Sequence, residues 1–317
     1  MRFMNTDPNK VLLLGIGETG LEVTQILGRN KVKGITTLGI DEESQLKLLY
    51  IHKIQEAELV MLVADLGSKK EGILTLQAAK LAKEHGKIVA SFVTIPRIFE
   101  GEKKIMHALE TAMELKSEVD ASLIINKENF SNLPEDGYSP AELVDSLLAV
   151  ENRIADAIQN MMALISGHGG VNIDLDDLKS ALELGGTFAI DSGFGIGEDR
   201  ISDAIDMVLS SPMMKTCDIF TSRKVLIRIL TPEKSPGIIR YAKIISEFIK
   251  KFPQHVDVTL GVGRLDDYDL SLFMILSELV YQLPTPVDVN LGERKADDDL
   301  SIVTILASGF DVKLPEK

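Results

Sequence analysis

Short apolar runs alternate with longer amphipathic segments along the first half of the chain. The segments between the runs have the apolar spacing of helices, as at 73–85 and 102–117. The apolar runs lie at 11–14, 35–40, 59–64, 88–94 and 122–125. This alternation is typical of a parallel sheet with helices on both faces. We therefore predict an α/β fold for this half of the chain.

A long helix is predicted over about 140–165, because apolar residues recur there every three or four positions. They are Leu143, Leu147, Val150, Ile154, Ile158, Met161 and Ile165. A glycine-rich stretch at 167–170 ends the segment, and 172–184 has the pattern of a short helix. We predict a central helix between two domains, 1–166 and 167–317.

The second half has a different order of elements. A strand at 186–191, a helix at 199–210, a strand at 224–230 and a helix at 236–251 precede a series of alternating strands, which favours an α+β domain. Residues 256–261 resemble 287–292, and 269–277 resemble 299–307, with an acidic turn inside each pair. We interpret the repeat as an extra β-hairpin that enlarges the sheet, although two amphipathic hairpins can also be similar by chance.

Composition limits the partners of the chain. Its 317 residues carry a formal net charge of −14, so bulk electrostatics opposes nucleic acid and anionic membranes. The N-terminus lacks the apolar run of a signal peptide, and no segment reaches the roughly 18 apolar residues of a membrane span. We predict a cytoplasmic protein without nucleic-acid partners or direct membrane insertion. The five histidines lack ligand-like spacing, so no metal site is predicted.

A candidate phosphate loop follows the first apolar run. Gly15, Ile16, Gly17 and Gly20 belong to a GxGxxG pattern between a strand and a helix, where backbone amides and the helix dipole can hold a phosphate. Asp41 ends the next strand, at the separation expected of a ribose-binding carboxylate. The same pattern fits an NAD-binding oxidoreductase, and a tight turn without a ligand is a further alternative.

Four segments, taken in order, match one protein family. The loop at 170–178 carries an NxDxxD pattern, Asn172, Asp174 and Asp177, directly after the long predicted helix. The other segments are VTIPRIFEG at 93–101, GIGEDRISDAI at 195–205 and ILASGFD at 305–311. Together they resemble FtsZ, the bacterial tubulin-like division protein, and the resemblance extends from about Val11 to Asp311.

This resemblance implies a first domain of tubulin/FtsZ type and a GTPase that assembles head to tail with itself or with another FtsZ-like subunit. GTP or GDP would be the cofactor, with Mg²⁺ accompanying GTP. The loop residues Asn172, Asp174 and Asp177 would act on a nucleotide held by the neighbouring subunit. The residues implied in nucleotide binding are Gly15, Ile16, Gly17, Gly20, Asp41, Gly67, Ser68, Lys69, Pro96, Glu100, Lys104, Asn126 and Asn152.

The chain departs from the family in three places that bear on GTP. Residues 67–73 stand where FtsZ has a glycine-rich signature, and their side chains enter space that glycine leaves to a phosphate. The stretch between Asp41 and Ala57 is too short for the loop that senses the terminal phosphate. Asn152 replaces an aspartate that accepts hydrogen bonds from guanine, and an amide discriminates less sharply.

We therefore expect a cytoskeletal, cell-division protein with weakened or altered GTP binding and hydrolysis. A nucleotide-free structural or filament-capping homologue is the alternative. The acidic loop has a structural interpretation as well, because Asp174 fits a helix N-cap and Asp176 and Asp177 fit the positive end of a helix dipole. Asn172 at the matching position favours the catalytic interpretation.

Overall fold

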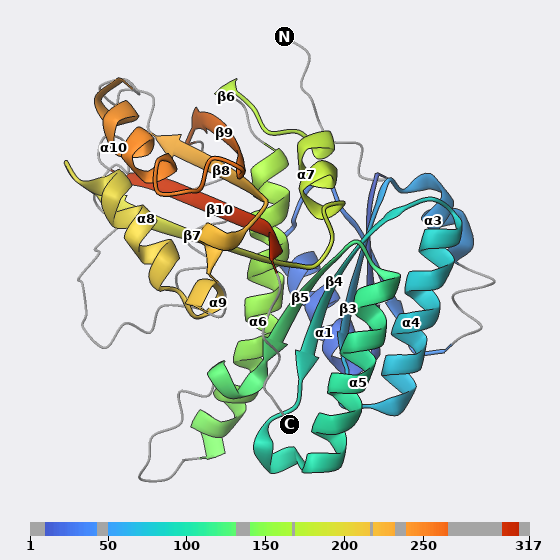
Figure 1. Cartoon of the computed structure of the whole chain (residues 1–317). Helices are drawn as coiled ribbons and strands as arrows, with labels where there is room; N and C mark the ends of the chain where they lie inside the picture. The colour runs from blue at the N-terminus through green and yellow to red at the C-terminus, as the bar shows by residue number, and fades with distance from the viewer. Residues whose placement is uncertain are drawn as a thin grey trace.

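A ten-stranded sheet runs through the computed structural model, which describes residues 10–42, 50–130, 140–166, 169–215, 218–231, 239–265 and 300–310 (Figure 1). The strand order is β2-β1-β3-β4-β5-β7-β10-β8-β9-β6. The strands are β1 (Val11–Ile16), β2 (Thr36–Ile40), β3 (Leu59–Asp65), β4 (Ile88–Ile95), β5 (Ala121–Asn126), β6 (Gly169–Val171), β7 (Thr187–Ile196), β8 (Lys224–Thr231), β9 (Asp257–Arg264) and β10 (Leu300–Phe310). The helices are α1 (Gly17–Arg29), α3 (Ile51–Glu56), α4 (Lys69–Glu84), α5 (Glu102–Glu118), α6 (Pro140–Ile165), α7 (Leu175–Leu182), α8 (Arg200–Ser210), α9 (Pro212–Lys215) and α10 (Ile239–Ile249), with short 3-10 turns η2 (Ile98–Glu100), η3 (Lys127–Phe130) and η4 (Ile219–Thr221).

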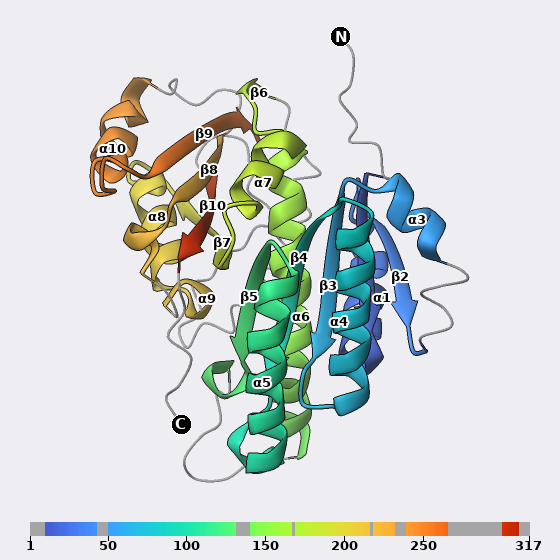
Figure 2. The same ribbon diagram turned by 45° about the vertical axis from the view of Figure 1, so that its right-hand side comes forward.

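Strands β1 to β5 are parallel and carry helices on both faces (Figure 2). Successive side chains of a strand point to opposite faces. Val11 and Leu13 therefore join the buried cluster that includes α1 and α6, while Leu12 and Leu14 join the cluster that includes α4 and α5. All five strands end at one edge of the sheet, and the loops that lead into α1, α4 and α5 start there.

The second half adds its strands to the same sheet. β10 pairs antiparallel with β7 and β8, and α8 and α10 cover this part through their own buried cluster. One parallel pair, Ser122 with Thr187, joins β5 to β7. Beside it, the rings of Phe92 and Phe188 pack edge to face with centroids 5.3 Å apart. Because one sheet crosses both halves, the domain boundary at 166/167 stays a prediction.

The structure confirms the mixed α/β class and most of the predicted elements, including the central helix α6 at 140–165. Helix α4 begins at Lys69 rather than at 73, because Lys69 and Lys70 are exposed and give its first turn no apolar period. Helix α7 is shorter than the predicted 172–184. Most of the repeated hairpin falls at 266–299, outside the described residues, so its strand pairing stays a prediction.

Candidate functional site

The turn from β1 into α1 has the backbone of an anion cradle. Gly17 begins α1 with a φ of 68°, in the left-handed region that glycine adopts readily. A Cβ on Gly15 would lie 2.2 Å from the carbonyl oxygen of Gly20, so only glycine lets this helix approach the strand so closely. The side chain of Ile16 is buried in the sheet. The N–H groups and dipole at a helix N-terminus attract negative charge, as predicted for this loop.

A side chain of the protein itself lies on this cradle. Glu71, in the first turn of α4, reaches so far that a Cβ on Gly17 would lie 2.2 Å from its carboxylate oxygen Oε1. The carboxylate also accepts a hydrogen bond from the backbone N–H of Glu18. Burial, followed by the nearby charge of Asp65, raises the pKa of Glu71 to about 6. A carboxylate thus holds the position in which the sequence predicts a phosphate.

Other charged side chains gather around Glu71 at the same edge. Asp65, at the end of β3, forms an ion pair with Lys127, which follows β5. Glu151 of α6 accepts a hydrogen bond from Thr19 Oγ1 at 3.2 Å, and burial raises its pKa. Asp65, Lys127 and Glu151 were not among the predicted site residues. The signal that could have found Asp65 is a charged residue directly after an apolar run, and Lys127 stands two positions after such a run.

Most of the segment 67–73, which stands where FtsZ has its glycine-rich signature, belongs to the start of helix α4. Gly67 packs against Pro96, because a Cβ on Gly67 would lie 2.6 Å from Pro96 Cγ. The N–H of Gly67 donates to Asp65 Oδ1 at 2.9 Å. Ser68 is the N-cap residue of α4, and Lys69 is exposed in its first turn. This segment therefore packs against the end of β3 and against Pro96, directly after β4, and begins a helix.

The residues predicted near sugar and base also have partners within the chain. Glu100 Oε1 accepts the N–H of Arg97 at 3.0 Å, and Glu100 Oε2 lies 3.8 Å from Lys104 Nζ. Asn126 Oδ1 accepts the N–H of Glu128 at 3.0 Å. Glu100 and Lys104 follow β4, and Asn126 is the last residue of β5, so the structure does bring them to the edge where the cradle lies.

The remaining two predicted binding residues are Asp41 and Asn152. Asp41 follows β2 and is exposed. Asn152 is partly exposed on α6, whereas the neighbouring Glu151 is the residue that hydrogen-bonds to Thr19 in the first turn of α1. The hydrogen bond from the first turn of α1 to α6 is therefore accepted by a carboxyl group one position before the predicted amide.

The loop with Asn172, Asp174 and Asp177 forms a surface corner at the start of α7. Asp174 Oδ1 accepts the N–H of Asp177 at 2.9 Å, and Asp177 Oδ2 accepts the N–H of Asp174 at 3.1 Å. This capping box uses one oxygen of each carboxylate, and a carboxylate has further acceptor sites. Asn172 and Asp174 are exposed and Asp177 is partly exposed. The capping interpretation is thus correct, and the catalytic role stays a prediction.

The corner and the cradle lie at opposite ends of the first five strands. Lys179 of α7 pairs with Glu58 at 2.6 Å, and Lys10 pairs with the same carboxylate at 2.7 Å. Lys10 and Glu58 directly precede β1 and β3, whereas the cradle follows these strands. Figures 1 and 2 both show α7 at one end of the strands and the start of α5 at the other. Hydrogen bonds from the two lysines, of which Lys10 has the larger effect, lower the pKa of Glu58 to about 2.

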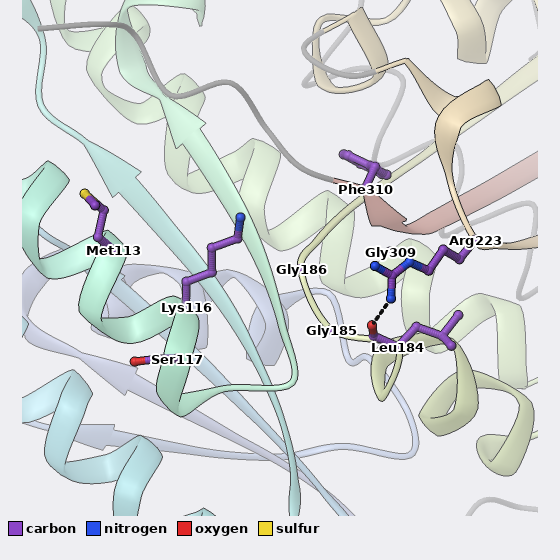
Figure 3. A pocket seen from close by; sticks show the side chains of 9 residues that line it. All are labelled: Met113, Lys116, Ser117, Leu184, Gly185, Gly186, Arg223, Gly309 and Phe310. Carbon is purple, nitrogen blue, oxygen red and sulfur yellow. Dashed lines mark hydrogen bonds between the residues drawn. The ribbon is translucent and has the colours of Figure 1, made fainter.

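A cavity of about 380 Å³ lies away from both places. Figure 3 shows Lys116 of α5 on one side of it and Arg223, just before β8, on the other. Arg223 Nη1 donates to the carbonyl oxygen of Leu184 at 3.2 Å. None of the predicted site residues lines this cavity, so it is not the candidate nucleotide site.

The residues at the cradle do not fit the phosphates of a nucleotide. Glu71 fills the space above Gly17, and Asp65 and Glu151 add negative charge that would repel a second anion. Within the described ranges, no group of three or more His, Cys, Asp or Glu side chains is arranged to hold a metal ion.

Comparison with solved structures identifies the fold. The chain is similar to an empty FtsZ dimer of M. jannaschii, with a TM-score of 0.70 and 19% identity over 97% of this chain and 94% of that one. It is also similar to CetZ2 from Haloferax volcanii in a GTPγS-bound protofilament, with a TM-score of 0.66 and 15% identity over 95% of this chain and 93% of that one. The fold is therefore that of the tubulin-like proteins.

Sequence relatives agree with this fold. They include the cell division protein FtsZ of Porphyromonas gingivalis, 28% identical over 242 residues, which are 76% of this chain and 52% of the relative. FtsZ of Aquifex aeolicus is 27% identical over 233 residues, 72% of this chain and 59% of the relative. The chain is a divergent protein of the FtsZ/tubulin superfamily.

Two further findings qualify this relationship. The chain spans little more than half the length of these curated relatives, and no protein-family model matches it. In the part of the chain that the structure describes, each helix is too short or too polar to cross a membrane.

Proposed function

We propose that this protein is an FtsZ-like cytoskeletal subunit that docks head to tail on a nucleotide-loaded partner of FtsZ type. Its α7 corner would reach the partner's nucleotide, while its own cradle would bind GTP weakly or not at all. The observation that carries the proposal is the contrast between an exposed acidic corner, with Asn172 and Asp174, and a cradle in which Glu71 lies over Gly17. Such a subunit would stimulate or cap a filament.

The comparisons support assembly in a cell-division setting. The sequence relatives are named cell division proteins, and solved neighbours include a dimer and a protofilament. GTP hydrolysis in the chain's own cradle is the second candidate, and the glycine turn around Gly17 is the observation that favours it. It would require Glu71 to leave the cradle. The family relationship does not favour the NAD-binding oxidoreductase.

Co-sedimentation with a conventional FtsZ tests the proposal. FtsZ of Porphyromonas gingivalis would be polymerised with GTP, and this protein added in rising amounts. We expect a change in both sedimented filament mass and GTP turnover, because a docked subunit supplies acidic groups at the filament end. Filament mass and turnover that stay constant would rule the proposal out. Calorimetry of the isolated chain with GTP, GDP and NAD separates the alternatives. Tight binding of GTP or GDP would favour hydrolysis in the chain's own cradle, tight binding of NAD would favour the oxidoreductase, and no binding would favour a nucleotide-free subunit.

A further inference from the structure

We infer that the Glu71 carboxylate is a built-in anion that takes the place of a phosphate and closes this chain's cradle to nucleotides. The inference deepens the proposed function and rests on it for its biological meaning. It assigns the closure to a single side chain, so one substitution is expected to reverse it.

The geometry places the carboxylate where an anion would bind. Its oxygen Oε1 would lie 2.2 Å from a Cβ on Gly17, the residue that begins α1. The backbone N–H of Glu18, in the first turn of α1, donates to it. A carboxylate and a phosphate offer the same features to a helix N-terminus, namely negative charge and oxygen acceptors. The two groups therefore compete for one position.

The surroundings leave little compensation for a second anion. Asp65 of β3 lies near Glu71, and Lys127, a nearby cation, is in an ion pair with Asp65. Glu18 of α1 adds a further negative charge beside Glu71. Glu151 of α6 lies near Asp65 and Lys127 as well. On the α5 side, His107 Nε2 would lie 3.6 Å from a Cβ on Gly72. A cradle lined in this way accommodates one carboxylate and excludes a polyphosphate.

Calorimetric titration with inorganic pyrophosphate tests the inference directly. The Glu71→Ala variant removes the built-in anion, and Glu71→Gln keeps its shape without its charge. Glu84→Gln is the matched control, because Glu84 is an exposed glutamate at the far end of the same helix. We expect wild type and control to bind pyrophosphate at least about tenfold more weakly than Glu71→Ala. The affinity of Glu71→Gln for pyrophosphate should lie between these values, because this variant loses the negative charge but keeps a side chain that fills the cradle.

Two results would overturn the inference: wild type that binds pyrophosphate as tightly as Glu71→Ala, or no gain in either variant. Thermal unfolding checks that each variant is folded, and a midpoint that rises with pyrophosphate gives an independent measure of binding. If Glu71→Ala does not fold, the comparison of Glu71→Gln with Glu84→Gln decides in the same way.

The outcome is separable from that of the proposed function. Titration uses the isolated chain, whereas docking is measured with a partner by co-sedimentation. Docking without a gain in the Glu71 variants would leave the head-to-tail proposal standing and refute the built-in anion. A gain without docking would do the reverse.

Discussion

Acidic side chains are partly buried at one end of the parallel strands and more exposed at the other. At the cradle end, Glu71 and Glu151 turn inward, and burial raises the pKa of both. At the α7 end, Asp174 stays at the surface, and Lys10 and Lys179 hold the pKa of Glu58 low. The comparison teaches that the chain can supply a carboxylate of its own to the N-terminus of a helix, as Glu71 does at α1. At the other end, acidic groups stay exposed on a helix that the Lys179–Glu58 ion pair connects to the start of β3.

The largest expected effect concerns the exposed end. If the α7 corner acts as proposed, partner-stimulated GTP turnover should fall at least about tenfold in the Asp177→Ala variant, because a carboxylate directed at the partner's nucleotide is lost. The measurement is phosphate release from GTP-loaded FtsZ with saturating variant. Asp176→Ala is the control. It removes the same charge from the same helical turn, but the Asp176 carboxylate pairs with Lys179 of its own helix at 2.7 Å. Equal turnover in the two variants would leave capping as the role of Asp177.

A second pair of variants separates the cap from chemistry at the same corner. Asp174→Ala should lower the free energy of unfolding by about 1 kcal/mol, because the N-cap of α7 is lost. Asp174→Asn can still accept the N–H of Asp177 and should keep most of that stability. Denaturant unfolding measures both. If stimulated turnover falls in Asp174→Asn while its stability is unchanged, the negative charge at 174 contributes to GTP turnover as well as to capping α7. Undiminished turnover would mean that Asp174 only caps the helix.

The cradle end predicts a pH dependence of stability with a defined sign. Glu71 has a folded pKa of about 6 against an ordinary value of 4.5, so its ionisation is harder in the folded state. Stability should fall as pH rises from about 4.5 to about 6, by about 1 kcal/mol after allowance for solvent screening of a half-exposed group. Buried groups such as Asp191 also have raised pKa values, so the quantity to measure is wild type minus Glu71→Gln. A difference that stays flat across this range would contradict the buried position of Glu71.

The smallest effect is expected where α7 is anchored. Glu58→Gln weakens the pairs with Lys179 and Lys10 and should lower the free energy of unfolding by about 0.5 kcal/mol near neutral pH, because both pairs are partly exposed to solvent. Its pKa is depressed in the folded state, so this contribution is present above about 4.5 and disappears as pH falls towards about 2. Glu56→Gln, at a neighbouring surface pair with Lys53, is the control. Identical acid unfolding of the two variants would argue against an anchoring role.

Much of the fold was predictable because its signals are local. The apolar runs at 11–14 and 59–64 became β1 and β3, and the period of three or four residues gave α6 its observed bounds. The polar first turn of α4 carries no such period, which is why the predicted helix begins at 73 and not at Lys69. The pairing of Ser122 with Thr187, which makes one sheet of two halves, joins residues far apart in sequence and has no local pattern.

By itself, the sequence determined the family, the strand-turn-helix at Gly17 and the acidic start of α7, since each depends on neighbouring residues. Only the tertiary structure decided what fills the cradle. Glu71 reaches Gly17 because α4 and α1 begin at the same edge of parallel strands, and Glu58 holds α7 because β3 begins at the opposite edge. Residue type sets which groups can carry charge, whereas the packing of helices on the sheet sets which of them meet.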